Sequence, residues 1–191
     1  MRTVNEANRE KFIQAAVMEL EEHGAADFSI RRVARRCGLS CAAPYKHFAG
    51  REELMLEVVR YINRKWDNIR NETVALRRNA SEQEILVAVC MAYITFLCTY
   101  PEYQMILFMN DRVFPVEIAA EKGKLSTAIE SLICDYCSKV HMDEEMRRRK
   151  QLVILSIICG ATQMIRAGSV PFDSQTIATI REAIENEISP T

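Results

Sequence analysis

The side chains whose types and spacing best suit chemistry lie between Phe28 and Arg51. This stretch contains no Asp or Glu, and its cations are Arg31, Arg32, Arg35, Arg36, Lys46 and Arg51. The whole chain carries 25 Lys and Arg against 26 Asp and Glu, so the cationic character is local to this stretch. Cations gathered on one face are what binding to nucleic-acid phosphates requires. A charged helix face is more often only solvated, and the charge pattern alone leaves that alternative open.

Two short helices joined by a tight turn would position these cations. Ser29 is a typical N-cap, because its hydroxyl can accept a hydrogen bond from a backbone N–H of the first turn. An apolar stripe at i, i+3, i+4 and i+7 follows, formed by Ile30, Val33, Ala34 and Cys37. Gly38 stands where a helix needs a left-handed residue, and Ser40 is predicted to cap a second helix from Cys41 to about Phe48. This pattern predicts a helix-turn-helix, whose second helix enters a DNA major groove.

The same residues carry a resemblance to a known family. The segment Phe28-Ser-Ile-x-x-Val-Ala-x-x-Cys-Gly-Leu-Ser, followed by Tyr45-x-His-Phe48 and Arg51-Glu-Glu-Leu54, resembles the N-terminal signature of the tetracycline-repressor (TetR) family. The resemblance implies a three-helix DNA-binding domain over residues 1–50 and a helical ligand-binding and dimerisation domain over residues 51–191. Few Gly and Pro residues likewise favour an all-α fold, for which we expect about nine helices.

The resemblance also implies roles for individual side chains. Family positions carried over to this chain place Ser29, Tyr45, His47 and Arg51 at the DNA backbone. Base edges or nearby phosphates would be contacted by Ser40, Cys41, Ala42 and Lys46, and Arg31 completes the predicted DNA-binding set. Lys46 can donate to guanine, and Ala42 can contact a thymine methyl group. Tyr45 as a packing aromatic and His47 as a plain surface histidine stay open as alternatives, whereas Phe48 is assigned to the core.

Pro44 departs from the commoner family pattern, which has a larger open-chain apolar residue before the tyrosine. We expect it in or just past the first turn of the second helix, where the missing N–H costs little. It can shift the angle at which this helix enters the groove and so change which base edges the helix contacts.

The rest of the chain is predicted to be helical. The first helix is expected from about Asn5 to Glu22, and a long helix from Arg51 to about Leu76 joins the two domains without a flexible linker. Ser81 and Glu84 form a capping box for the next helix. The later helices are expected at Glu82 to about Thr99, Glu102 to about Met109, Pro115 to about Lys139, Asp143 to about Gly168, and from Pro171 onwards, with an irregular piece around Asn110 to Phe114.

Two features near the C-terminus predict contact with a second copy of the chain. The stretch from Leu152 to Ala161 is apolar on all sides except at Ser156, so protein must cover it all round. Isoleucines recur in the last helix as a narrow seam of the kind that meets a partner helix. The resemblance implies the same, since TetR proteins dimerise through their last two long helices. The predicted interface consists of Leu152, Leu155, Ile158, Cys159, Ile177, Ile180 and Ile184.

Aromatic and methionine side chains between Tyr93 and Phe114 predict a region that binds a small molecule. Such side chains line many adaptable pockets, although they also fill ordinary cores. The candidates are Tyr93, Phe96, Tyr100, Tyr103, Phe108 and Met109. A ligand bound there would favour one spacing of two DNA-binding heads through its differential affinity.

The cysteines suggest an alternative to a small-molecule effector, in which the regulator responds to a metal ion or to oxidation. Cys134, Cys137 and His141 lie at i, i+3 and i+7, but structural zinc needs four ligands and no fourth is local, so no metal site is assigned. Buried cysteines usually behave as small apolar residues. Cys41 is expected in the first turn of the second helix beside basic residues, a setting that lowers the pKa of a thiol. A thiol- or metal-responsive regulator of the same fold therefore stays open.

Composition and motifs limit the function classes. The 191 residues can bury a core, the first residues lack an apolar signal region, and seven cysteines suggest a reducing compartment, so we expect a cytoplasmic protein without a membrane partner. No phosphate loop, nucleophile elbow or HExxH occurs, so neither an enzyme nor a cofactor is expected. We expect a homodimeric regulator, acting as a repressor, that a small-molecule effector releases from its double-stranded DNA operator. A helical interaction module without DNA binding is the alternative.

Overall fold

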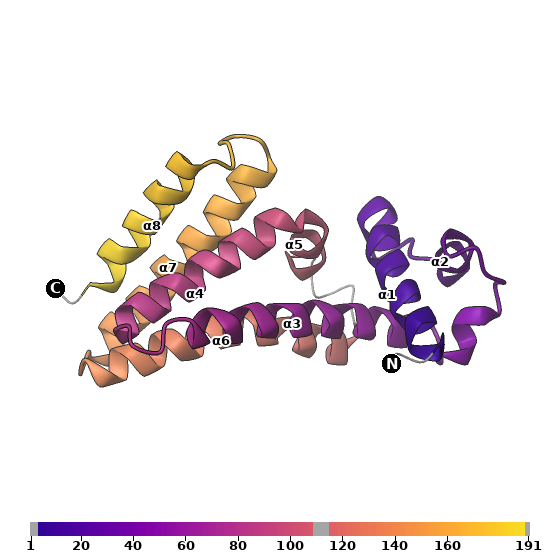
Figure 1. Ribbon diagram of the computed structural model, residues 1–191, viewed down its shortest axis with the longest axis horizontal. Helices are drawn as coiled ribbons and strands as arrows, with labels where there is room; N and C mark the ends of the chain where they lie inside the picture. Colours follow the sequence, from indigo (N-terminus) through magenta and orange to yellow (C-terminus); the bar gives the residue numbers. More distant parts are fainter. Residues whose placement is uncertain (1–3, 109–114, 190–191) are drawn as a thin grey trace. The chain divides into compact units, whose positions relative to one another are not determined.

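All regular elements in the described part of the chain are helices (Figure 1). The structure is a computed structural model, and it describes residues 4–108 and 115–189. In chain order the elements are α1 (Val4–His23), α2 (Ile30–Arg36), the 3₁₀ helix η1 (Ala43–Lys46), α3 (Arg51–Ala75), α4 (Glu82–Thr99), α5 (Pro101–Phe108), α6 (Val116–Lys139), α7 (Glu144–Arg166) and α8 (Ser174–Ile188). Within these ranges the prediction of an all-α fold with about nine helices is confirmed.

The described residues fall into two compact units. The first lies within Met1–Lys65 and Glu102–Lys124, and the second within Trp66–Pro101 and Leu125–Thr191. Helices α3 and α6 each contribute residues to both units. The units therefore divide inside helices. The predicted division into a DNA-binding domain over residues 1–50 and a ligand-binding and dimerisation domain over residues 51–191 stays a prediction.

The core of the first unit forms where α1 packs against α2. Phe12 and Leu20 of α1 are buried, as is Val33 of α2. The Phe12 ring meets the Phe48 ring edge-on, with 6.3 Å between the ring centroids. Phe48 is only 2% exposed, which confirms its assignment to the core.

Several helix ends form where local sequence signals predict them. The Ser29 hydroxyl caps α2 by accepting from the Arg32 N–H at 3.4 Å. Gly38 follows α2 with a φ of 71°, the left-handed region that favours glycine. Ser81 and Glu84 form the predicted capping box of α4.

The second helix of the motif differs from the prediction. In place of an α-helix from Cys41 to about Phe48, a turn leads into η1, which spans only Ala43–Lys46. The sequence predicts Ser40 as the cap of this helix, but no side chain caps η1. The N-cap role of Ser40 and the predicted length of the second helix are therefore wrong.

Pro44 supplies the physical reason for this difference. Proline has no N–H, so it cannot make the bond to the Ser40 carbonyl that an α-helix requires at this position. Its ring also disfavours the α conformation at the preceding residue, Ala43. The Tyr45 N–H bonds instead to the Ala42 carbonyl at 3.3 Å, the i to i−3 spacing of a 3₁₀ helix.

The second unit is built on α4, α7 and α8, which all pack against one another. Ile180, Ile184 and Ile188 of α8 are buried within this one chain, as is Ile158 of α7. The isoleucine seam is therefore covered by helices of the same chain, and its burial needs no second copy. The sequence predicts that protein covers the middle of α7 all round, but Leu152 is 69% exposed in the single chain.

Helix α4 is, among the described residues, the one helix that is long and apolar enough to span a membrane by length and composition. Its apolar window is 56% buried inside the structure. The core helix of a soluble protein has the same length and composition, so this helix is weak evidence for a membrane contact.

Candidate nucleic-acid interface

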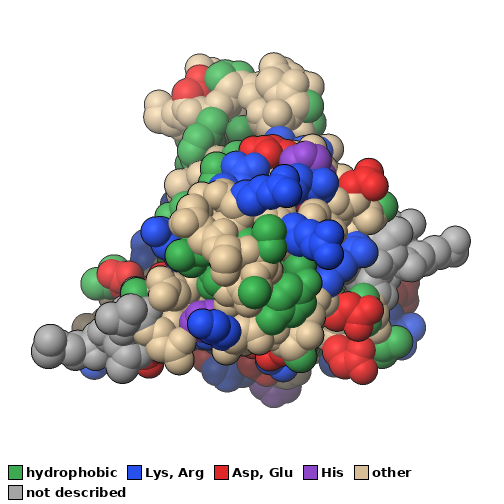
Figure 2. All heavy atoms as spheres, turned by 90° about the vertical axis from the view of Figure 1, so that its right-hand side faces the viewer, with side chains coloured by type: hydrophobic (Ala, Val, Ile, Leu, Met, Phe, Trp, Pro, Cys, Tyr) green, Lys and Arg blue, Asp and Glu red, His purple; other side chains and the backbone are tan. Residues whose placement is uncertain are grey.

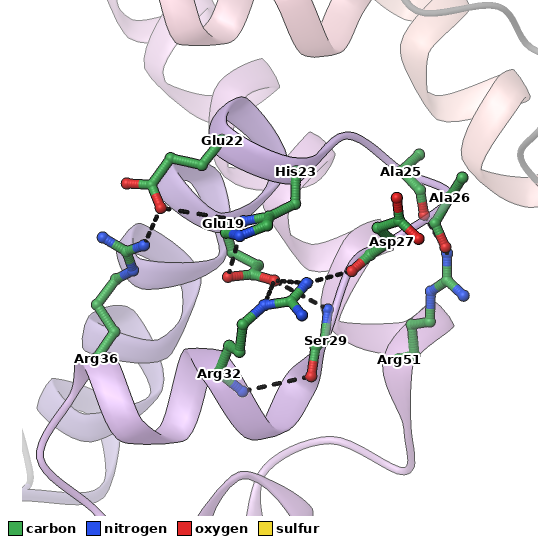
Figure 3. Close-up of polar contacts among 10 residues, drawn as sticks. All are labelled: Glu19, Glu22, His23, Ala25, Ala26, Asp27, Ser29, Arg32, Arg36 and Arg51. Carbon is green, nitrogen blue, oxygen red and sulfur yellow. Dashed lines mark hydrogen bonds and ion pairs between the residues drawn. The ribbon is translucent and has the colours of Figure 1, made fainter.

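The four arginines of α2 divide into two pairs with different surroundings. Arg32 and Arg36 turn towards α1, where Arg32 bonds to Glu19 and Arg36 bonds to Glu22 (Figure 3). Arg31 and Arg35 are exposed, and neither has an ion-pair partner in the part of the chain that the structure describes. Because residues four apart share one face of a helix, this second pair forms a single outward cationic face.

Glu19 is the buried centre of the contact between α1 and α2. Its side chain is 0% exposed, and its Oε1 accepts from Arg32 Nε at 2.6 Å and from the Ser29 backbone N–H at 3.2 Å. Its Oε2 lies 3.5 Å from His23 Nδ1 (Figure 3). The carboxylate therefore holds the first turn of α2 against α1.

Glu19 lies outside every motif that the sequence predicted. The available signal was a carboxylate four residues after Ala15 on a helix whose neighbouring positions, Ala16 and Leu20, are apolar. A buried carboxylate is rarely tolerated without a cationic or hydrogen-bonding partner. Such a position therefore indicates a partner on another element, here Arg32.

The turn and η1 place all four predicted base-contacting residues at the surface. Ser40, Cys41, Ala42 and Lys46 are exposed, and the Tyr45 ring is 53% exposed. Lys46, like Arg31 and Arg35, has no carboxylate within ion-pair distance among the described residues. This turn therefore presents a cation, a phenol and small polar side chains together.

Two side chains that were predicted to contact phosphate, Arg51 and His47, make contacts with other residues of the same chain. The guanidinium of Arg51 donates to the carbonyls of Ala25 and Ala26 and so closes the loop between α1 and α2. His47 is half-buried, and its ring lies 5.5 Å from that of Phe12. A structural role is thus visible for both side chains, while their contact with DNA remains a prediction.

Figure 2 shows the face formed by the right-hand side of Figure 1, where α1 and α2 are labelled. Lys and Arg side chains gather on this face and border an area of hydrophobic side chains. Exposed cations beside a turn with an exposed aromatic ring suit non-covalent binding to a polyanion.

Comparison with known proteins bears directly on this face. Residues 12–58 match the model of a family described as bacterial regulatory proteins, tetR family. The segment from residue 12 to residue 58 belongs to the TetR family. The match contains α2, η1 and the turn between them, so it covers all the residues of the candidate interface from Ser29 to Arg51. The family is one of transcription regulators, which confirms that the chain is not an enzyme.

Individual TetR-family proteins are similar to this chain over different lengths. Over 81 residues it is 30% identical to the HTH-type transcriptional regulator BetI of Agrobacterium fabrum, a match that spans 42% of this chain and 38% of that regulator. A TetR family transcription regulator of Marinobacter aquaeolei has a TM-score of 0.77 at 18% identity and covers 98% of both chains. FadR of Bacillus subtilis, in complex with stearoyl-CoA, has a TM-score of 0.73 at 14% identity over 94% of this chain and 97% of that one. These structural likenesses establish the TetR fold.

The aromatic candidates for the effector region divide between the two units of this chain. In the second unit, Tyr93 and Phe96 are buried against Trp66, with ring centroids 4.7 Å and 5.9 Å apart respectively. Tyr100 extends this cluster, 5.5 Å from Phe96. Burial raises the pKa of the Tyr93 hydroxyl, so this group stays neutral.

The other candidates belong to the first unit. Tyr103 is buried on α5, and its ring meets Tyr61 of α3 edge-on at 6.4 Å. Lys65 places its ammonium 5.1 Å from the Tyr61 ring and 5.4 Å from the Tyr103 ring. Phe108 is 51% exposed, and Met109 lies outside the described residues.

The cysteines do not form a metal site in the described part of the chain, where no group of three or more His, Cys, Asp or Glu side chains is placed to hold an ion. Helix α6 ends at Lys139, so His141, with a φ of 58°, does not continue the helix face of Cys134 and Cys137. The Cys134 thiol accepts from Gln151 Nε2 at 3.0 Å. Cys41 is exposed on the turn before η1.

Proposed function

We propose that this protein is a DNA-binding transcription regulator of the bacterial cytoplasm that acts as a homodimeric repressor and is released by a small molecule. The observation that carries the proposal is the separation of the α2 arginines. Arg32 and Arg36 are bound to carboxylates of α1, which leaves Arg31 and Arg35 exposed on α2, which contacts the helix η1 that carries Lys46. Phosphate binding requires cations that are not already neutralised by carboxylates.

The turn before η1 supports sequence recognition beside this phosphate contact. Tyr45 can donate its hydroxyl to a phosphate, while Ser40, Cys41 and Ala42 are small enough to approach base edges. A two-fold dimer would present two such heads, which must lie about 34–36 Å apart to enter successive major grooves. Dimerisation therefore belongs to the same proposal.

Helix α7 offers the surface for that dimer. Leu152 and Met164 are 69% and 49% exposed, and Cys159 between them is exposed as well. Leu152 and Cys159 are seven residues apart and therefore share one exposed face of α7, and exposed apolar side chains on a helix favour contact with another protein surface. Leu155 and Ile177 are half-buried at the edge of this surface, while Ile158, Ile180 and Ile184 would support it from beneath.

An effector would act by binding one dimer geometry more tightly than the other, with a typical coupling of about 1–3 kcal/mol. Two separate aromatic clusters each support a site for an apolar molecule, one around Trp66 in the second unit and one around Tyr103 in the first unit. The structure of FadR with stearoyl-CoA is that of a similar fold with an acyl ligand. Acyl-CoA molecules are therefore reasonable first probes of release.

The DNA proposal is tested by fluorescence anisotropy with DNA from upstream of the protein's own gene, over a series of salt concentrations. The variant Arg31→Ala with Arg35→Ala should bind more weakly, and its salt slope should fall by about 0.9 for each phosphate that is no longer neutralised. Arg78→Ala is a matched control, because Arg78 is exposed and lies in the second unit. Equal affinities and equal slopes for the double variant and the control would rule out this phosphate-binding face.

A further inference from the structure

Gln104 of α5 is a buried amide whose hydrogen-bonding capacity is unused. The residue is 2% exposed, and neither its Nε2 nor its Oε1 has a hydrogen-bond partner in the described structure. Proteins pair nearly all buried polar atoms with protein groups, ordered water or a ligand, because an unpaired group keeps the full cost of leaving water. Glutamine is also seldom buried to this extent.

A second buried amide in the same unit makes structural bonds through its donor alone, because the Oδ1 of Asn63 also has no hydrogen-bond partner in the described structure. Asn63 of α3 is 7% exposed, and its Nδ2 donates to the backbone oxygen of Glu121 at 2.9 Å and to the carboxylate Oε1 of Glu121 at 2.8 Å. This amide therefore connects α3 to α6. Gln104 makes no corresponding connection within the described residues, so a structural bond does not explain its burial.

The neighbour of Gln104 on α5 is firmly placed. Tyr103 packs edge-on against Tyr61, and the Lys65 ammonium lies over both rings. Burial raises the pKa of Tyr103 to about 12, against the opposing hydrogen bond from Lys65. Because α5 is anchored to α3 beside Gln104, the amide is held in position while its polar atoms stay unpaired.

We propose that Gln104 is the polar anchor of the effector site and that the effector is an apolar molecule bearing a carboxamide-type group. An amide side chain offers both a donor, Nε2, and an acceptor, Oε1. A second carboxamide satisfies both atoms at once, whereas a ketone, ester or carboxylate only accepts and leaves Oε1 unpaired. This inference rests on the proposed function, because it names the chemistry of the ligand that would release the repressor.

The test compares two probes that differ in one group, octanamide and methyl heptyl ketone, in which a methyl group replaces the NH₂. Binding to the full-length protein is measured without DNA, by calorimetry and by thermal unfolding. The wild-type protein should bind octanamide roughly tenfold or more tightly than the ketone, because the site rejects a ligand that leaves its buried acceptor unpaired. Gln104→Met, which keeps the side-chain length without the amide, should lose this preference.

Unliganded stability gives a second readout that needs no ligand. Gln104→Met should melt higher than the wild type by ~2–4 °C, because it removes unpaired polar atoms from an apolar site. Gln14→Met is the control, since Gln14 is an exposed glutamine of α1 in the same unit, and its melting temperature should not change.

Two results would overturn the assignment. One is a wild-type protein that binds neither probe or binds both equally. The other is a Gln104→Met variant that melts below the wild type, which would show that ordered water or protein groups satisfy the amide. Failure of the wild-type protein to bind its operator would instead count against the proposed function, and the operator titration measures that outcome separately.

Discussion

The Arg32 guanidinium lies against the buried Glu19 carboxylate, with 2.6 Å between Arg32 Nε and Glu19 Oε1. This contact joins α2 to α1, and its two partners differ in exposure. The Glu19 side chain is 0% exposed, whereas that of Arg32 is 41% exposed. The buried carboxylate is therefore the more sensitive member, because its removal leaves donors of the α2 N-terminus without an acceptor.

Replacing Glu19 should destabilise the DNA-binding head. We expect Glu19→Gln to lower the free energy of unfolding by about 1–3 kcal/mol, because a neutral amide oxygen accepts these hydrogen bonds more weakly than the buried carboxylate does. Urea unfolding followed by circular dichroism measures this change. Glu22→Gln is the matched control, since the Glu22–Arg36 pair is solvent-exposed and should contribute less than about 1 kcal/mol. Equal effects for the two variants would contradict the role given to Glu19.

Glu57 should make stability depend on pH in the acid range. It bonds to Arg9 of α1 at 2.6 Å and to Arg60 at 2.8 Å. Burial would raise its pKa, but the hydrogen bonds from Arg60 and Arg9 outweigh burial and hold the pKa below the ordinary value of 4.5. Since the folded pKa is depressed, this stabilisation is present above pH 4.5 and is lost as pH falls through the folded pKa.

The variant Glu57→Gln isolates this contribution. The free energy of unfolding is measured for both proteins at a series of pH values above and below 4.5. The wild-type protein should lose more stability than the variant as pH falls, so the two curves should converge in acid. Curves that stay parallel would show that Glu57 does not titrate at a lower pKa when the protein is folded.

Pro44 should be responsible for the 3₁₀ form of η1. The variant Pro44→Ala supplies an N–H that can donate to the Ser40 carbonyl, and it removes the steric restriction on Ala43. We expect the segment from Cys41 to Phe48 to gain α-helical character, seen as slower amide exchange and helical chemical shifts in NMR spectra. An unchanged spectrum over these residues would mean that tertiary contacts, and not the proline, impose the 3₁₀ form.

Tyr45 and Lys46 should contribute to DNA binding without stabilising the fold. Both side chains are exposed, Tyr45 at 53%. We expect Tyr45→Phe with Lys46→Ala to weaken operator binding by roughly 10-fold or more, since a hydrogen bond and an ionic interaction with phosphate are removed. Anisotropy titrations measure the affinity, and an unchanged melting temperature shows that the fold is intact. Full retention of affinity would remove both residues from the interface.

Features whose partners are close in sequence were predictable from the sequence. The capping box joins Ser81 to Glu84, three residues away, and the left-handed turn at Gly38 depends on the backbone freedom of that residue alone. Such local bonds depend little on the rest of the fold. The signature around Tyr45 and Phe48 likewise identified the TetR family, because it combines turn chemistry with core positions in a short segment.

The tertiary structure alone decided which side chains of these elements bind other residues of the chain and which stay exposed. The four arginines of α2 are chemically alike, and only the packing of α1 separates Arg32, bound to Glu19, from Arg31, which faces solvent. In the same way, the isoleucine seam that contains Ile184 could be covered by a second copy or by the same chain. The packing of α8 against α4 and α7 decides that it is buried within one chain. The residue type determines what a side chain can bind. Which partner it binds, when that partner is distant in sequence, depends on how the helices pack, and no local sequence pattern contains this information.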